Sequence, residues 1–171
     1  MLEYDLILYF NIDKWRSFMS FIKDNIMDTT KRLNISLKKL SEQEKILLKN
    51  NIKKFLKKDT KFFLWEMLKN YTCVQHKEAW SWIKDFIKNT KCIMFFNYQD
   101  EKEAYFLDNG NILQSLLSET YNFEFYITNE TYEYLLCFNH HDVLFATGTA
   151  EAWLSSYAKQ KKISIYSITY K

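Results

Sequence analysis

The chain contains very few of the residues that bend or end secondary structure. Its 171 residues include 2 glycines and no proline. Sandwiches and barrels made of many short strands need such residues at their tight turns, so the composition disfavours both. A helix-rich α+β fold is the class that it favours. The length suits one ordinary domain or a domain with an extra helical layer, and it is sufficient to bury a hydrophobic core.

Cysteine is equally scarce. The three cysteines, Cys73, Cys92 and Cys137, are scattered and lack C-x-x-C spacing. This pattern predicts neither a disulfide framework nor a structural zinc site, and it favours a reducing cytosol as the compartment. Cys137 lies inside an apolar stretch, where a buried and inert thiol is expected.

Long apolar runs and a positively charged leader are missing as well. No apolar run in the sequence approaches the length of a membrane-spanning helix. Glu3 and Asp5 lie where a secretory signal peptide would carry positive charge. We therefore expect a cytoplasmic protein without a membrane partner.

Charge is segregated along the chain although the formal net charge is only +3. Residues 31–61 hold eleven basic residues against three acidic ones, a difference of +8. Residues 97–151 hold one basic residue against ten acidic ones, a difference of −9. Such asymmetry indicates what each half meets in solution and says little about the fold.

The periodicity of apolar residues predicts an α+β fold in which an N-terminal helical layer packs on an antiparallel sheet of about five strands, with a C-terminal helix. We expect one domain over residues 1–171, with a mainly helical portion at 1–90 and a sheet-containing portion at 91–171. Ser41 and Glu44 have the spacing of a capping box at a helix start. Apolar spacing predicts a strand or an extended lead into a helix at 2–10, further helices from Asp13, at 60–69, at 77–88 and from Ile112, and strands at 92–98, 104–107 and 163–170.

Residues 121–153 form the stretch around which the rest is predicted to pack, as two hairpins followed by a helix from Thr149. A two-residue turn at Asn129 and Glu130 would place Ile127 opposite Tyr132. After a second turn at 139–142, the returning strand would place Phe145 opposite Leu136.

The second turn carries His140, His141 and Asp142, the only dense group of metal ligands or acid/base side chains in the sequence. A metal or catalytic site would need further groups from other segments, and His76 is the only other histidine. We interpret the group as turn-forming or partner-binding. An acid/base or metal-dependent enzyme is the alternative.

A second alternative concerns the basic segment. Lys45, Lys49, Lys53 and Lys57 repeat along one predicted helix, and clustered cations of this kind can bind nucleic acid. The segment has a single arginine and little aromatic interleaving, so a solvated helix surface is the preferred interpretation.

The segment YEYLLCFNHHDVLFATGTAEAW, with FEFYIT before it, resembles the closing part of a poorly characterised family of small bacterial proteins. The resemblance covers about residues 92–154. The matching residues are Tyr132, Tyr134, Leu135, Leu136, Cys137, Asn139, His140, His141, Asp142 and Gly148.

Proteins of this kind resemble immunity proteins encoded beside polymorphic or contact-dependent toxins. The resemblance implies no catalytic residue, metal or cofactor, and it implies a cognate protein toxin as partner. Together with the acidic half, it leads us to expect a binding protein that masks the active or substrate-binding surface of a basic toxin, for example a nuclease. The candidate partner-binding residues are Glu101, Glu103, Tyr126, Glu130, Glu133, Tyr134, His140, His141 and Asp142, of which Tyr126, Tyr134 and His140 would be central anchors if exposed.

Overall fold

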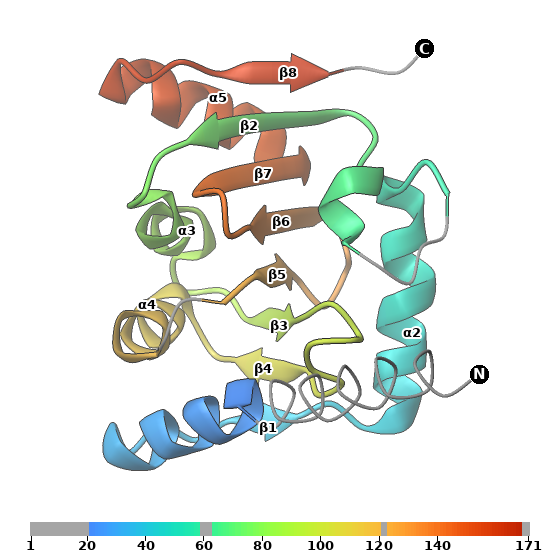
Figure 1. Cartoon of the computed structure of the whole chain (residues 1–171), viewed down its shortest axis with the longest axis vertical. Helices are drawn as coiled ribbons and strands as arrows, with labels where there is room; N and C mark the ends of the chain where they lie inside the picture. The colour runs from blue at the N-terminus through green and yellow to red at the C-terminus, as the bar shows by residue number, and fades with distance from the viewer. Residues whose placement is uncertain (1–20, 59–62, 121–122, 169–171) are drawn as a thin grey trace, which may run out of the picture.

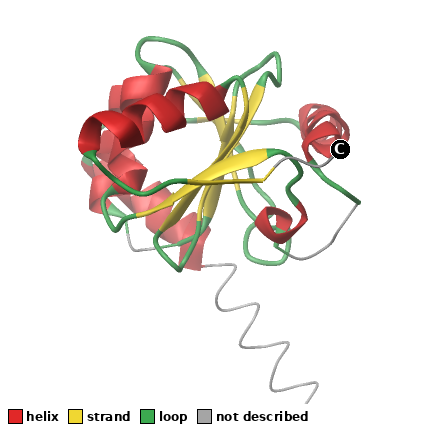
Figure 2. Ribbon diagram, turned by 90° about the horizontal axis from the view of Figure 1, so that it is seen from above, coloured by secondary structure: helices red, strands yellow, loops and turns green. Residues whose placement is uncertain are grey.

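The computed structural model describes residues 21–58, 63–120 and 123–168. These residues form one eight-stranded sheet with helices on both faces (Figures 1 and 2), and the strand order is β1-β4-β3-β5-β6-β7-β2-β8. All neighbouring strands are antiparallel. The strands are β1 (Lys38–Lys39), β2 (Tyr71–Gln75), β3 (Cys92–Phe95), β4 (Tyr105–Leu107), β5 (Phe125–Thr128), β6 (Tyr134–Phe138), β7 (Val143–Gly148) and β8 (Tyr166–Ile168).

Two of the described helices begin at a residue whose side chain caps the first turn. The α-helices with described ends are α2 (Glu42–Ile52), α3 (Ala79–Ile87), α4 (Gly110–Glu119) and α5 (Ala150–Lys161), and residues 21–32 are helical as well. The predicted capping box is confirmed, because Ser41 Oγ accepts from Glu44 N at 3.3 Å and Glu44 Oε2 accepts from Ser41 N at 2.7 Å. Asn109 caps α4 by accepting from Ile112 N at 3.0 Å.

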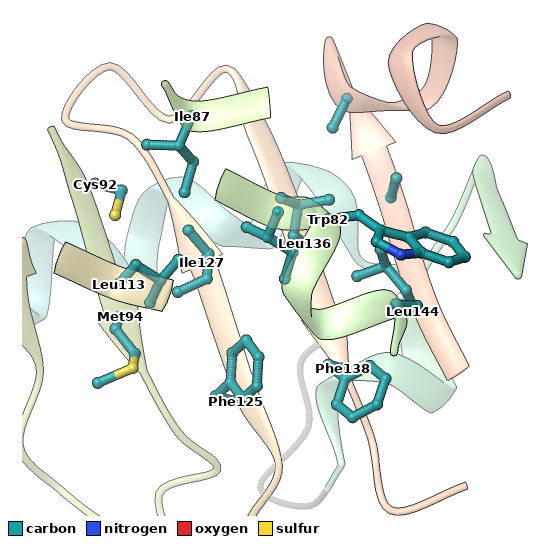
Figure 3. Packing of buried hydrophobic residues seen from close by; sticks show 14 of the residues in the cluster. Trp82, Ile87, Cys92, Met94, Leu113, Phe125, Ile127, Leu136, Phe138 and Leu144 are labelled. Carbon is teal, nitrogen blue, oxygen red and sulfur yellow. The ribbon is translucent and has the colours of Figure 1, made fainter. Parts of the chain in front are cut away.

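The first face of the sheet is covered by α3, α4, α5 and the helix at 21–32. Figure 1 shows α3 and α4 on the side of the sheet opposite α2. Ile83 and Leu113 from these helices join Met94, Ile127 and Leu136 from the central strands in one apolar cluster. Figure 3 shows this packing, with Phe125 and Phe138 at one end of it.

The second face is covered by α2 and by two short 3-10 helices, η1 (Lys53–Phe55) and η2 (Leu64–Met67). Leu48 and Ile52 of α2 pack with Leu135, Tyr126 and Phe145 in a second apolar cluster. Because both faces are covered, every residue of β3, β5 and β6 is buried.

The α+β class is therefore confirmed, whereas the estimate of about five strands is wrong. Two additional strands, β1 and β2, come from the portion predicted to be mainly helical, and β2 lies between β7 and β8. The helix predicted at 60–69 is described only as the short η2. Ile46 of α2 is exposed, although an apolar residue in a helix that packs on a sheet is ordinarily buried. The late strand at the C-terminal side is confirmed as β8 at an edge of the sheet.

The predicted pairing of the central strands is wrong in register. Ile127 lies opposite Leu136 instead of Tyr132, a shift of four residues. Phe145 lies opposite Cys137 instead of Leu136, a shift of one. A shift by an odd number moves a side chain to the other face, so Phe145 packs in the second cluster.

The strand or extended segment predicted at 2–10, and the start of the helix from Asp13, lie outside the described residues. The described continuation of that helix buries Ile22 and Ile26, as its periodicity predicts. None of the helices in the described ranges is both long and apolar enough to cross a membrane.

Candidate functional site at the β6–β7 turn

The turn between β6 and β7 holds two histidines on the surface. Its backbone is fixed by Asn139, which is buried and whose Oδ1 accepts from His141 N at 3.0 Å and from Val143 N at 3.2 Å. Asp142 adopts a left-handed conformation with φ 58°, and its carbonyl accepts from His76 N at 2.8 Å. The turn is therefore tied to its own start and to the end of β2. These hydrogen bonds fix the backbone of the turn at His140 and His141, and thereby the points from which the two side chains extend.

A buried carboxylate lies directly against the first histidine. Oε1 of Glu124, at the entry to β5, accepts from His140 N at 3.2 Å and is in hydrogen-bond contact with His140 Nδ1. The Glu124 side chain is 8% exposed and that of His140 is 54% exposed. An ionised carboxylate can only accept, so Nδ1 carries the proton and the other ring nitrogen, Nε2, is left for an outside group.

Asn97, just beyond β3, joins this pair to three other residues. Its Nδ2 donates to Glu124 Oε2 and to Asp100 Oδ2, both at 3.1 Å. Its Oδ1 accepts from Tyr126 Oη at 2.9 Å and from Leu64 N at 3.4 Å. Both the nitrogen and the oxygen of the Asn97 side-chain amide thus have two hydrogen-bond partners, and the amide links these residues into one network.

The network concentrates negative charge in a poorly solvated place. Burial raises the pKa of the Asp100 carboxyl; the hydrogen bond from Asn97 lowers it, and the neighbouring Glu124 raises it again. Burial also raises the pKa of the Tyr126 phenol well above its ordinary value. No lysine or arginine in the described part of the chain lies within ion-pair distance of Asp100 or Glu124. The His140 ring is the neighbouring group that hydrogen-bonds to Glu124 from the surface side.

Two aromatic side chains, Phe63 and Trp65 at the start of η2, border the histidines. The two imidazole rings lie 3.9 Å apart between centroids. The Trp65 ring meets His140 and His141 edge-on at 6.4 and 6.0 Å, and Phe63 lies 6.2 Å from His140. Trp65 is itself stacked on Phe145 at 5.8 Å. Aromatic and histidine rings therefore form one continuous patch at this end of the sheet, and rings of this kind are enriched at binding surfaces.

A separate small cleft opens on the first face of the sheet, on the other side of the same turn. Its volume is about 240 Å³, and Phe125 and Phe138 (Figure 3) form part of its wall. Neither His140 nor His141 lines it, whereas Asp142 does. The remaining lining residues are Lys77, Trp80, Leu117, Ser118, Thr120 and Phe123.

Potential metal ligands are not grouped in the described ranges. No three His, Cys, Asp or Glu side chains there lie close enough together to hold a metal ion. Cys137 is buried as expected, and burial raises the pKa of its thiol well above the ordinary value. It pairs with Tyr126 on the neighbouring strand.

The nine residues predicted to bind a partner do not form one surface. His140, His141 and Asp142 share the β6–β7 turn, as predicted. Tyr126 and Tyr134 are buried, so the condition for their role as anchors is not met and neither is available on the surface. Both belong to strands that are buried on two sides. The alternating pattern of the strand that holds Tyr126 indicates a half-buried strand, whereas the apolar residues on both faces of the strand that holds Tyr134 indicate a central one.

The predicted carboxylates are also separated. Glu101 is buried, and its Oε1 accepts from Glu103 N at 2.8 Å. Glu103 pairs with Lys39 at 3.6 Å and Lys45 at 3.3 Å. Glu130 and Glu133 lie in the β5–β6 connection, at the opposite end of the sheet from the histidines. Only the turn residues remain together as a candidate surface.

The basic segment partly neutralises the acidic one within the chain. Lys45, one of the four lysines considered for nucleic-acid binding, pairs with Glu42 at 2.6 Å and with Glu103. Arg32 pairs with Glu119 at 3.0 Å. Opposite charges of the two segments thus meet in ion pairs within the chain, which reduces repulsion between like charges in each segment.

Sequence reasoning missed Glu124, Asn97, Asp100 and Trp65. Glu124 stands in an alternating apolar strand pattern, where a charged residue is ordinarily assigned to the solvated face. Asn97 ends a continuous apolar run, a position typical of a strand end. The sequence carries no signal that these residues meet, because they lie in segments that are far apart in the chain and come together only when the protein folds.

The fold and the site define a three-layer α+β protein with a surface histidine pair supported by a buried polar network. A family model described as Family of unknown function (DUF6756) matches residues 19–158. The chain belongs to this family. The matched range includes the whole β6–β7 site, and neither a curated protein nor a solved structure matches the chain.

Proposed function

We propose that this chain is an immunity protein that binds and neutralises a bacterial toxin domain, and that it docks through the sheet end that carries His140 and His141. The observation that supports the proposal most is the exposed imidazole of His140 held against buried Glu124. A rigid exposed polar group beside aromatic rings is suited to recognition, since little conformational freedom is lost when a partner binds.

The surroundings of the histidines favour a docking surface over a reaction chamber. The cleft near this turn lies on the other face of the sheet and is lined by neither imidazole. The Trp65 and Phe63 rings border the pair from one side. A partner protein would cover such a patch and exclude water from it, which is the arrangement typical of an interface centre.

Charge at this end of the sheet suits a basic partner. Asp100 and Glu124 share the Asn97 amide without a described lysine or arginine beside them, and Asp142 lies in the turn itself. A lysine or arginine of the toxin placed here would balance this charge, and a basic active-site cleft of a nuclease would supply one. Association should then slow and affinity should weaken as salt concentration rises.

The proposal is tested with the protein encoded next to this chain as candidate toxin. Co-expression should rescue growth, and the purified chain should bind the toxin domain in a titration. His140→Ala combined with His141→Ala should weaken binding at least about tenfold, or about 1.4 kcal/mol. Glu130→Gln, at the opposite end of the sheet, is the matched control and should change affinity less than about twofold.

The outcomes separate the function from the docking face. No rescue and no binding by the wild-type chain would refute the immunity function for that toxin. Rescue that is lost with Glu130→Gln and retained with the double histidine variant would keep the function and move the docking face to the other end of the sheet.

An acid/base enzyme is the second candidate, and the Glu124–His140 contact is the observation that favours it. A buried carboxylate bound to Nδ1 orients an imidazole as a general base, with Nε2 toward the substrate. Hydrolysis of model esters or phosphodiesters by the purified chain, abolished by His140→Ala without a change in circular dichroism, would establish this function. Equal residual rates in the wild type and the variant would reject it.

A further inference from the structure

The two edges of the sheet differ in how they are protected. The edge strand β1 consists of Lys38 and Lys39, which pair with Glu44 at 3.9 Å and Glu103 at 3.6 Å. Lysines on a very short edge strand discourage another strand from pairing with it. This edge is therefore closed to strand addition.

The opposite edge, β8, has no such protection. Residues 163–168 read Ile-Ser-Ile-Tyr-Ser-Ile and carry no charge. β8 pairs with β2 along one side only, and within the described residues no strand pairs with its outer side (Figure 1). Tyr166 is 64% exposed and Ile168 is 40% exposed. An uncharged edge strand rich in β-branched and aromatic residues is a site for strand addition.

We propose that a second copy of this chain pairs with β8, so that two sheets join into one across a twofold axis. Antiparallel pairing of a strand with its own copy is the arrangement that a twofold axis produces. With the axis at Ser167, Tyr166 of each copy lies opposite Ile168 of the other. An aromatic residue opposite a β-branched residue is a favourable cross-strand pair.

The faces of the strand fit this register. Tyr166 lies opposite Cys73 and Ile168 lies opposite Tyr71, so both side chains are on the face of the second apolar cluster. Tyr71 packs edge-on against Phe145 at 5.3 Å within that cluster. Pairing of two β8 strands would therefore extend the apolar surface of this face from one copy to the other.

Charge favours a second copy over a different protein as the occupant. The chain has a net charge of +3, yet residues 163–168 bring no like charges together when two copies pair. β1 could not pair with its copy in this way, because its lysines would face the lysines of the other chain. Cross-strand pairs between two uncharged β8 strands are expected to be more favourable than pairs between β8 and a charged extended segment.

Sedimentation equilibrium of the full chain tests the proposal. The wild type is expected at twice the 20.8 kDa mass of the chain at tens of micromolar. Tyr166→Lys with Ile168→Lys should give a monomer over the same range. Ile46→Lys with Leu47→Lys is the matched control, because these apolar residues of α2 are 61% and 53% exposed and lie away from β8. That control should remain dimeric.

A cysteine variant tests the register and remains informative if the lysine variant unfolds. Ser167→Cys places two thiols across the proposed axis and should give a disulfide-linked dimer under mild oxidation. Ser156→Cys, on the exposed side of α5, should not. A monomeric wild type, a dimeric β8 lysine variant, or equal cross-linking of both cysteine variants would overturn the proposal. The result does not depend on the toxin, so it stands or falls separately from the proposed function.

Discussion

The buried carboxylate of Glu124 is hydrogen-bonded to Nδ1 of His140, whose side chain is about half exposed to solvent. The two residues lie on either side of the central hairpin in the sequence, since Glu124 precedes β5 and His140 follows β6. Because Phe125 pairs with Phe138 in the antiparallel ladder, Glu124 and His140 lie close together at the open end of this hairpin. The contact is thus a direct consequence of the strand register.

Replacing Glu124 by alanine should release the His140 ring and destabilise the fold. The variant removes the acceptor of His140 N and one acceptor of the buried Asn97 Nδ2, and a buried polar group that loses its partner costs about 1–3 kcal/mol. Urea unfolding measures this loss. Nitrogen NMR of the imidazole should show the Nδ1–H tautomer in the wild type and a mixture in the variant.

Glu130→Ala is the control for this experiment, because Glu130 is exposed in the β5–β6 connection. Its free energy of unfolding should stay within about 0.5 kcal/mol of the wild type. Unchanged imidazole nitrogen shifts in Glu124→Ala would show that the carboxylate does not set the tautomer.

Asn97 and Tyr126 should be energetically coupled. Tyr126 Oη donates to Asn97 Oδ1 at 2.9 Å, and both side chains are buried. In a double-mutant cycle of Asn97→Ala and Tyr126→Phe, the two losses of unfolding free energy should fail to add by about 0.5–3 kcal/mol. Additive losses would mean that the two residues contribute independently.

The sequence predicts the fold class because its longer periodic segments form the type of secondary structure that their apolar spacing indicates. α3, α4 and α5 lie where apolar spacing places helices, and β3 to β7 lie where extended patterns occur. β2 was missed because five residues between two helical patterns carry a weak signal. β1 was missed because two lysines carry none.

Register was harder to predict than the elements themselves. The β5–β6 connection runs over residues 129–133, with Tyr132 at φ 55°, instead of a two-residue turn. The resulting shift of four residues is even, so the side chains of β5 keep their predicted faces. The histidine turn was found from the sequence because its residues are adjacent. Its support was not, because Asn97 and Glu124 are 27 residues apart and meet only in the folded sheet.

Two carboxylates should affect stability with opposite dependence on pH. The pKa of Asp100 is raised in the folded state, chiefly by burial, so its ionisation opposes folding as pH rises above the ordinary value of 3.8. Asp100→Asn should therefore raise the urea midpoint at pH 7, and the gain should shrink as pH falls toward 3.

Glu44 provides the control of opposite sign. Its pKa is lowered, chiefly by the backbone hydrogen bond from Ser41, so its contribution is present above the ordinary value of 4.5 and is lost as pH falls through the folded-state pKa. Glu44→Gln should lower the urea midpoint at pH 7 and approach the wild type at pH 3. Midpoint differences that do not change with pH would contradict both assignments.

Gly148 should not tolerate a side chain. It ends β7 at φ +66°, a conformation that favours glycine, and an added Cβ would lie 2.3 Å from the carbonyl oxygen of Glu133 and 3.0 Å from the Phe55 ring. The clash with backbone cannot be relieved by rotating a side chain, so β6, β7 or η1 must shift. Gly148→Ala should therefore lose more than about 2 kcal/mol of unfolding free energy. Ser156→Ala, at an exposed position of α5, should change it by less than about 0.5 kcal/mol in the same urea titration. A Gly148→Ala variant as stable as this control would show that the β7–α5 junction adapts without strain.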